Sequence, residues 1–169
     1  MSTLFIYIIY FLLVSFAYAC LKGAPWVPTW NGDMQRFLEL ADIKKGQKMY
    51  DLGCGDGRLV CIAANAGAKA VGFEISIFPY LLACFRVIFS RTPNCKIQFK
   101  NFWQVDLGDA DIVYFFLMPK FYPRLKEKLE KELRVGTKVI AYSWAIEGWV
   151  PLKKSTHQNK VNMYLYEIK

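Results

Sequence analysis

The fold of this chain is decided by one stretch, Tyr50-Asp51-Leu52-Gly53-Cys54-Gly55-Asp56-Gly57-Arg58. Its three alternating glycines follow a short apolar run, which predicts the end of a buried strand. They precede residues 58–66, a run of small and apolar residues that predicts a helix closed by a glycine. A glycine-rich turn from a strand into a helix lets backbone N–H groups approach a ligand without a Cβ in the way. We therefore expect a ligand-binding loop at residues 53–57.

Two common phosphate-binding loops do not match this stretch. The dinucleotide pattern Gly-x-Gly-x-x-Gly, counted from Gly53, requires its third glycine where Arg58 stands. The P-loop pattern requires Gly-Lys-Ser/Thr after four spacers, and no such sequence follows. A tight turn that merely needs glycines stays the alternative, so a second signal is required.

The second signal is a short predicted strand, residues 70–75, which ends in an acid. Glu74 stands 17 residues after Gly57 (74 − 57 = 17). In open α/β sheets, an acid at the tip of the second strand accepts hydrogen bonds from a ribose diol. One carboxylate with two acceptor oxygens suits two adjacent hydroxyl donors. The pair of signals predicts a nucleoside-containing ligand.

Length, charge and cysteine content limit the remaining possibilities. The 169 residues suit one domain, and the net charge is +8. The positive residues are scattered, without a basic stripe interleaved with aromatics, so we expect no nucleic acid and favour an anionic membrane surface. Five cysteines without ligand spacing and a single histidine predict no metal site and suggest a reducing compartment.

Residues 4–21 carry no charged side chain. A run of about 20 apolar residues is long enough to span a bilayer as a helix, so we expect residues 1–22 to form a single-pass membrane anchor. A cleaved signal peptide is the alternative, although no Lys or Arg precedes the run. Positive residues follow the run, so we expect residues 23–169, the remaining domain, to lie on the cytoplasmic side.

Two further segments carry unusual apolar surface. Residues 23–30 combine two prolines with two tryptophans, and we expect this segment to lie over the ligand site and touch the membrane. Residues 77–89 predict a helix that is apolar on nearly all faces. One face must cover the sheet, and we expect the other to rest on the bilayer, with a homodimer contact as the alternative.

The rest of the chain alternates predicted strands and helices, which indicates an α/β, Rossmann-like, doubly wound and mostly parallel sheet. The remaining predicted elements are a strand at 96–100, a central strand at 112–117, a helix at 122–133, a strand at 138–144 and a terminal strand at 161–167. Asn101 and Phe102 follow a predicted strand, where an amide and an aromatic ring can read the edge and face of adenine.

The pattern Asp-x-Gly-x-Gly-x-Gly resembles the loop of the class I, seven-strand methyltransferases, which bind S-adenosylmethionine. That resemblance implies that Asp51 helps to place the cofactor and that the tip of the fourth strand faces the methyl group. The cofactor-binding residues expected from the motifs are Asp51, Gly53, Cys54, Gly55, Gly57, Glu74, Ile75, Asn101 and Phe102. The residues expected on the acceptor side are Thr29, Met118, Pro119 and Trp144.

Five segments together (23–29, 50–58, 71–74, 109–119 and 147–151) are similar to a small family of class I protein-lysine methyltransferases. Its eukaryotic members act in the mitochondrial inner membrane on the ATP synthase c subunit or the adenine nucleotide translocase. The resemblance implies N-methylation of a lysine in a membrane protein. Methylation of a lipid or a small hydrophobic metabolite, and a non-catalytic S-adenosylmethionine-binding module, stay open. No catalytic residue is assigned; Glu147 is the hypothesis for a general base.

Overall fold

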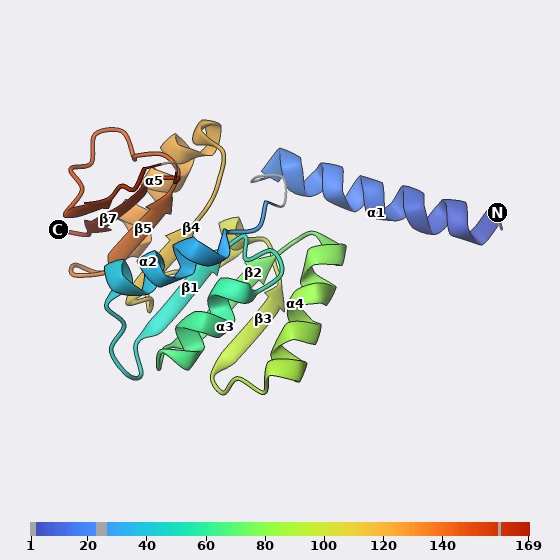
Figure 1. The fold of residues 1–169 in the computed structure, drawn as a ribbon. Coiled ribbons are helices and arrows are strands. Elements are labelled where there is room, and N and C mark those ends of the chain that lie inside the picture. Colours follow the sequence, from blue (N-terminus) through green and yellow to red (C-terminus); the bar gives the residue numbers. More distant parts are fainter. Residues whose placement is uncertain (1–2, 23–26, 159) are drawn as a thin grey trace.

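The computed structural model describes residues 3–22, 27–158 and 160–169 and contains one seven-stranded sheet in the order β3-β2-β1-β4-β5-β7-β6 (Figure 1). The strands are β1 (Lys48–Leu52), β2 (Lys69–Glu74), β3 (Cys95–Phe99), β4 (Ile112–Phe115), β5 (Lys138–Tyr142), β6 (Lys153–Ser155) and β7 (Met163–Glu167). The helices are α1 (Thr3–Lys22), α2 (Asn31–Ala41), α3 (Arg58–Asn65), α4 (Ile77–Ser90) and α5 (Tyr122–Glu132), with short 3-10 turns η1 (Phe102–Gln104) and η2 (Pro119–Phe121).

The sheet confirms the predicted doubly wound α/β architecture. Strands β1 to β5 run parallel, and β7 runs antiparallel to both β5 and β6. The chain moves outward from β1 through β2 to β3, then returns to β4 on the other side of β1. Such a reversal of strand order opens a crevice at the carboxyl ends of the two central strands, where ligands bind in open α/β sheets.

Two buried clusters hold helices on opposite faces of the sheet. One cluster includes Phe37 of α2 and Leu59 of α3, and both side chains are almost fully buried. The other includes Leu125 and Leu129 of α5, which confirms the apolar face predicted for residues 122–133. The two clusters hold β1 and β4 in the middle of the sheet, so the site at their carboxyl ends rests on the most buried strands.

The sheet differs from the sequence prediction at several strand ends and in one added strand. Strand β5 ends at Tyr142 rather than at residue 144, and β7 begins at Met163 rather than at residue 161. Strand β4 ends at Phe115, two residues earlier than predicted, so residues 116 and 117 belong to the loop at the strand tip. Strand β6 was not predicted, because Lys153-Lys154-Ser155 is short and charged and lacks the alternation of a half-buried strand. It forms at the edge of the sheet because β7 supplies the backbone partners.

Helix α1 projects away from the domain beside the first turn of α4 (Figure 1). Its described side chains include Leu4, Tyr7, Tyr10 and Leu13, each more than 60% exposed. In residues 3–22, 27–158 and 160–169, no helix combines the length and the hydropathy needed to cross a membrane. The predicted single span at residues 4–21 is therefore unsupported, and the predicted cytoplasmic orientation of residues 23–169 stays untested.

Candidate functional site

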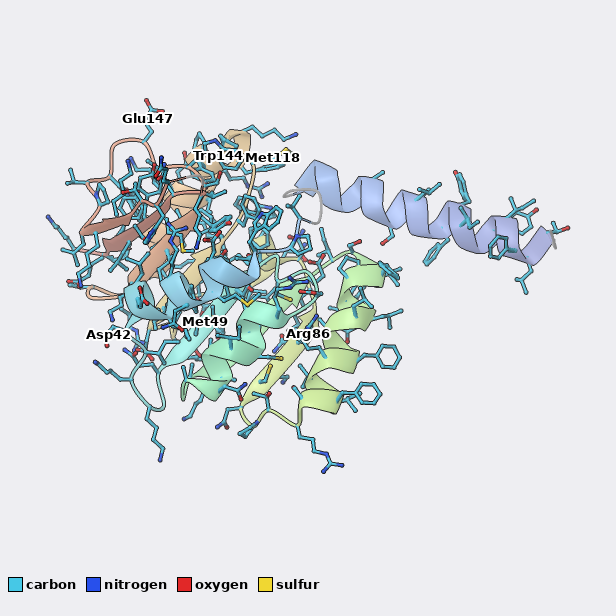
Figure 2. The ribbon with its side chains drawn as sticks, in the orientation of Figure 1. Asp42, Met49, Arg86, Met118, Trp144 and Glu147 are labelled. Carbon is cyan, nitrogen blue, oxygen red and sulfur yellow. The ribbon has the colours of Figure 1, made fainter. Side chains whose placement is uncertain are left out.

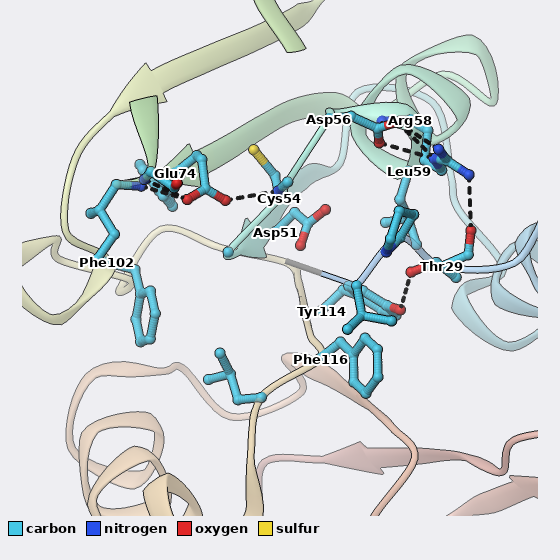
Figure 3. Close-up of a pocket in the computed structure, with 18 of the residues that line it drawn as sticks. Thr29, Asp51, Cys54, Asp56, Arg58, Leu59, Glu74, Phe102, Tyr114 and Phe116 are labelled. Carbon is cyan, nitrogen blue, oxygen red and sulfur yellow. Dashed lines mark hydrogen bonds and ion pairs between the residues drawn. The ribbon is translucent and has the colours of Figure 1, made fainter. Parts of the chain in front are cut away.

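A pocket opens at the carboxyl ends of β1, β2 and β4 and encloses about 790 Å³ of empty space, part of it open to solvent (Figure 3). Its lining combines apolar side chains with a few polar groups, as ligand-binding pockets do. Among the lining residues are the predicted residues Thr29, Asp51, Gly53, Cys54, Gly55, Glu74, Ile75 and Phe102. The topology thus brings together the two motifs that the sequence singled out.

The glycine loop has a backbone that other residues adopt only with strain. Gly53, Gly55 and Gly57 have φ angles of 93°, 55° and 72°. The N–H groups of Gly53 and Cys54 both donate to the carbonyl oxygen of Phe73 at 3.0 Å. Because Phe73 lies at the end of β2, these bonds fix the loop against that strand, and left-handed glycines allow the turn. Gly57 does not line the pocket and instead precedes α3.

Glu74 lies against the glycine loop and is 8% exposed. Its Oε2 accepts the N–H of Gly55 at 2.9 Å, and its Oε1 accepts those of Ile75 and Ser76 at 2.8 and 2.7 Å. Burial raises the pKa of Glu74, and the three N–H donors oppose that rise. Each carboxylate oxygen accepts about two hydrogen bonds, so Oε2 retains one site for a hydroxyl group. The geometry fits the predicted contact with a ribose.

Asp51 is a buried carboxylate without a partner. It is 3% exposed and lines the pocket, and no hydrogen bond to its side chain is seen in the described part of the chain. Burial, and then the charge of Glu74, raises the pKa of Asp51 well above its usual range. A buried charge is costly unless it is paired. A cationic ligand would relieve that cost, and S-adenosylmethionine carries an ammonium and a sulfonium group. The residues therefore fit this cofactor.

Asp56 ties the glycine loop to its neighbours. Its carboxylate accepts from Arg58 at 2.6 Å and from Arg86 of α4 at 2.8 Å. Burial alone would raise the pKa of Asp56, but the hydrogen bonds and charges of the two arginines outweigh burial and lower it. Arg58 also donates to the backbone carbonyl of Thr29 at 3.3 Å. Residues 27–29 are thereby held over the loop as a strap along one side of the pocket.

The strap has a second attachment on the floor of the pocket. The hydroxyl groups of Thr29 and Tyr114 lie 3.1 Å apart, and burial raises the pKa of Tyr114 well above its usual range. Residues 27–29 of the predicted segment 23–30 line the pocket, whereas Trp30 is 72% exposed and does not. Residues 23–26 lie outside the described residues, and the predicted contact of this segment with the membrane stays a prediction. Tyr114 stands opposite Asp51 in the register of β1 and β4. Figure 3 shows Thr29 and Tyr114 meeting beside Phe116 at the pocket wall.

Besides Gly57, four predicted residues do not line this pocket. Asn101 lies beside it, and its side chain accepts the N–H of Trp103 and caps η1, so its contact with adenine stays a prediction. Trp144 is 42% exposed and stacks on Phe116, with ring centroids 6.1 Å apart. Met118 and Pro119 follow Leu117, which does line the pocket. Met118, Pro119 and Trp144 follow β4 and its neighbour β5, at the end of the sheet where the acceptor was expected.

Glu147 receives no support as a general base. It is exposed, and Figure 2 shows its side chain pointing outward from the domain. It also borders a different cavity, which includes Pro119 and Tyr122. Within the described residues, no group of three His, Cys, Asp or Glu side chains could hold a metal ion.

Sequence reasoning missed several lining residues. Arg58, Ser76, Lys100 and Phe116 line the pocket, although no motif named them as site residues. Arg58 follows the last glycine directly, and an arginine there could have been expected to pair with Asp56. Phe116 gives no such signal, since an apolar residue at the end of an apolar run reads as core.

Residues 51–153 match the family model described as the ANTKMT methyltransferase domain. This chain belongs to that family. It is 37% identical over 150 residues to a protein-lysine N-methyltransferase of Saccharolobus islandicus, covering 85% of this chain and 93% of the relative. It is 33% identical over 133 residues to the adenine nucleotide translocase lysine N-methyltransferase of Mus musculus, covering 76% of this chain. The chain spans only 56% of the length of that mouse protein.

A solved structure with the same architecture contains the demethylated cofactor. The RNA methyltransferase from Salinibacter ruber, in complex with S-adenosyl-L-homocysteine, superimposes with a TM-score of 0.79 at 29% identity. The match covers 84% of this chain and 94% of that one. The family and the fold confirm the class I methyltransferase prediction, and S-adenosylmethionine is the cofactor.

Proposed function

We propose that this protein transfers a methyl group from S-adenosylmethionine to the side-chain amine of a lysine in another protein. The observation that carries the proposal is the 37% identity to a named protein-lysine N-methyltransferase across nearly the whole of both chains. The pocket supports it, because the chain retains a buried acid at each of the two positions that the cofactor needs, Asp51 and Glu74.

The contribution of the chain is mainly to hold the reactants in line. When bound, S-adenosylmethionine supplies an electrophilic methyl group on a sulfonium. Glu74 is placed to accept from the ribose, and Asp51 to face the cationic methionyl end, both at the carboxyl edge of the sheet. The strap at residues 27–29 lines one side of the pocket and is held to Tyr114 and Arg58. Alignment of this kind supplies a large part of the rate in a bimolecular reaction.

The acceptor lysine must reach the site without its proton. An ordinary lysine has a pKa of about 10.4, so the neutral amine at pH 7 costs roughly 4–5 kcal/mol. An apolar, aromatic surrounding lowers the pKa of an amine because it disfavours the charged form. Phe116 and Trp144 offer such surroundings beside the strand tip, and aromatic faces also hold methylated ammonium groups. We assign the acceptor entrance to this side, with the proton released to solvent.

We infer further that the acceptor belongs to a membrane protein. The support is α1, whose described side chains are apolar and largely exposed. Transfer of these exposed apolar side chains from water into an apolar phase lowers the free energy of the protein. The helix would bring the domain close to lysines near a membrane surface.

Two other acceptors are weighed against lysine. RNA is one alternative acceptor, because the similar protein from Salinibacter ruber is named an RNA methyltransferase. Against RNA, the sequence that follows β4 is Leu117-Met118-Pro119. Amino methyltransferases acting on bases carry an Asn/Asp-Pro-Pro-aromatic motif there, as part of the class I resemblance. A lipid or a small hydrophobic metabolite would also suit an apolar entrance. Both alternatives are separated from lysine by the same experiment.

The experiment incubates the full chain with methyl-tritiated S-adenosylmethionine and total membranes, soluble proteins and RNA from cells that lack the gene. We expect the label in protein and, after acid hydrolysis, in methylated lysine. The matched control is Asp51→Asn, which should lower labelling of every fraction. Label in RNA or in the organic-solvent extract, with none in methyl-lysine, would contradict the proposal.

A further inference from the structure

Helix α4 presents an apolar stripe to the outside of the molecule. Leu81, Phe85, Ile88 and Phe89 are 47%, 56%, 67% and 80% exposed. Their spacing of three and four residues places them on one face, and the rings of Phe85 and Phe89 stack at 6.4 Å. The opposite face of α4 buries Ala83 against the glycine loop. A helix that covers a sheet normally has a polar outer face, so this stripe requires an explanation.

The chain segment that carries the stripe has only positive charges. Between Ile75 and Val105 the chain carries four positive residues and no carboxylate; they are Arg86, Arg91, Lys96 and Lys100. Arg86 is paired with Asp56 of the glycine loop, and the other three are exposed. Lys96 and Lys100 alternate with Ile97 and Phe99, which pack toward α4, and so project from the other face of the edge strand β3. Arg91, which directly follows α4, adjoins the stripe.

Helix α1 is continuous with this surface. The hydroxyl of Ser15 accepts the N–H of Ile77 at 3.1 Å, which satisfies one of the unpaired donors in the first turn of α4. Figure 2 shows the outer side chains of α4 pointing to the side of the domain on which α1 extends. The apolar side chains of the two helices therefore face a common region.

We propose that the outer face of α4 lies on an anionic lipid bilayer, with the helix in the plane of the headgroups. An amphipathic helix binds in this way when apolar side chains enter the acyl boundary and basic residues meet anionic headgroups. The stripe supplies the first group, and Arg91, with Lys96 on the neighbouring edge strand, supplies the second.

A second copy of the chain is a poorer occupant of the same face. Helix α1 extends past this face, and in a two-fold dimer, where the same patch faces itself, both copies of α1 would have to fit beside the contact (Figure 1). A bilayer can accept the stripe and the exposed apolar side chains of α1 together. The proposal goes beyond methyl transfer, and it is tested by lipid contact, so its failure would leave the lysine assignment untouched.

The experiment places an added tryptophan on the stripe of the full chain. Phe89→Trp and the control Val150→Trp are mixed with vesicles of phosphatidylcholine and phosphatidylglycerol in equal amounts, with or without bromine on the acyl chains. Val150 is 89% exposed and lies outside α4, so it is a matched control. The added signal is the fluorescence of each variant minus that of the wild type, whose five native tryptophans also emit. We expect the bromines to reduce the added signal of Phe89→Trp roughly twofold and that of Val150→Trp little.

A charge variant tests the lipid class. Arg91→Glu/Lys96→Glu should abolish the preference for phosphatidylglycerol over phosphatidylcholine vesicles, whereas Arg134→Glu, exposed elsewhere, should retain it. An added signal of Phe89→Trp that the bromines leave unchanged would overturn the proposal. In that case, a dimer in sedimentation that Phe89→Ser dissociates would assign the outer face of α4 to a second copy of the chain. A monomer in sedimentation would show that this face contacts neither lipid nor a second copy.

Discussion

The cofactor half and the acceptor half of the site are built differently. On the cofactor side, the glycine loop and Glu74 are joined by backbone hydrogen bonds, and Asp51 and Glu74 are almost fully buried. On the acceptor side, Trp144 is 42% exposed and Met118 caps the short 3-10 turn η2. A rigid half suits a ligand of fixed shape, and an open half suits a segment of another macromolecule. The difference predicts that substitutions in the two halves affect different ligands.

The largest effect is expected from Asp51→Asn. The amide is nearly isosteric but cannot balance a cationic ligand, so affinity for S-adenosylmethionine should fall on the order of 100-fold. The same change removes a buried acid whose ionisation is costly in the folded protein, so the free energy of unfolding at pH 7 should rise by about 1–3 kcal/mol. Calorimetric titration and chemical denaturation measure the two effects. An unchanged affinity would remove Asp51 from the cofactor half.

The pH dependence of that stability gain follows from the pKa of Asp51. Its folded-state pKa is raised, so the folded protein holds a proton that the unfolded chain releases above about pH 4. The wild-type stability contributed by Asp51 is therefore present at low pH and falls as pH rises toward the folded-state pKa. Asp51→Asn does not titrate. Denaturation curves of the two proteins should agree near pH 4 and separate as pH rises; a constant difference would contradict this account.

A smaller loss is expected from Glu74→Gln. One oxygen of the carboxylate becomes an amide that cannot accept the N–H groups of the loop or a ribose hydroxyl. Affinity for S-adenosylmethionine should fall about 30-fold, and the free energy of unfolding should decrease by about 1–2 kcal/mol. The opposite signs of the stability changes for Glu74→Gln and Asp51→Asn separate a satisfied buried acid from an unsatisfied one. The same assays measure both.

The strap should contribute less than either acid. Arg58→Gln removes a donor to Asp56 and to the carbonyl of Thr29. Because Arg86 still pairs with Asp56, we expect only about a tenfold loss of cofactor affinity. Arg134→Gln removes an exposed ion pair with Asp111 and serves as the control. Equal losses in the two variants would show that the strap does not hold the site.

The smallest effect on the cofactor half is expected from Trp144→Ala. This ring is partly exposed and stacks on Phe116, outside the lining of the pocket. The KM for the protein substrate should rise about fivefold, while affinity for S-adenosylmethionine stays unchanged. Val150→Ala, at a more exposed position, should change neither. A loss of cofactor affinity in Trp144→Ala would erase the distinction between the two halves.

The pocket lining contains most of the predicted cofactor-binding residues but only Thr29 of the predicted acceptor-side residues, for a physical reason. Glycines with positive φ and acids at strand tips are demanded by one ligand at fixed spacing, so Asp51, Gly55 and Glu74 could be named in advance. The contact between Thr29 and Tyr114 joins residues 85 positions apart, and no local pattern encodes it. Strand β6 likewise depends on its partner β7.

The most direct test is a titration of S-adenosylmethionine into the wild-type full chain, Asp51→Asn and Trp144→Ala under one set of conditions. The account predicts binding to the wild type, a loss on the order of 100-fold in Asp51→Asn and no change in Trp144→Ala. Equal affinities in all three folded proteins, or equal losses in both variants, would contradict the assignment of the cofactor to the glycine loop and its two buried acids.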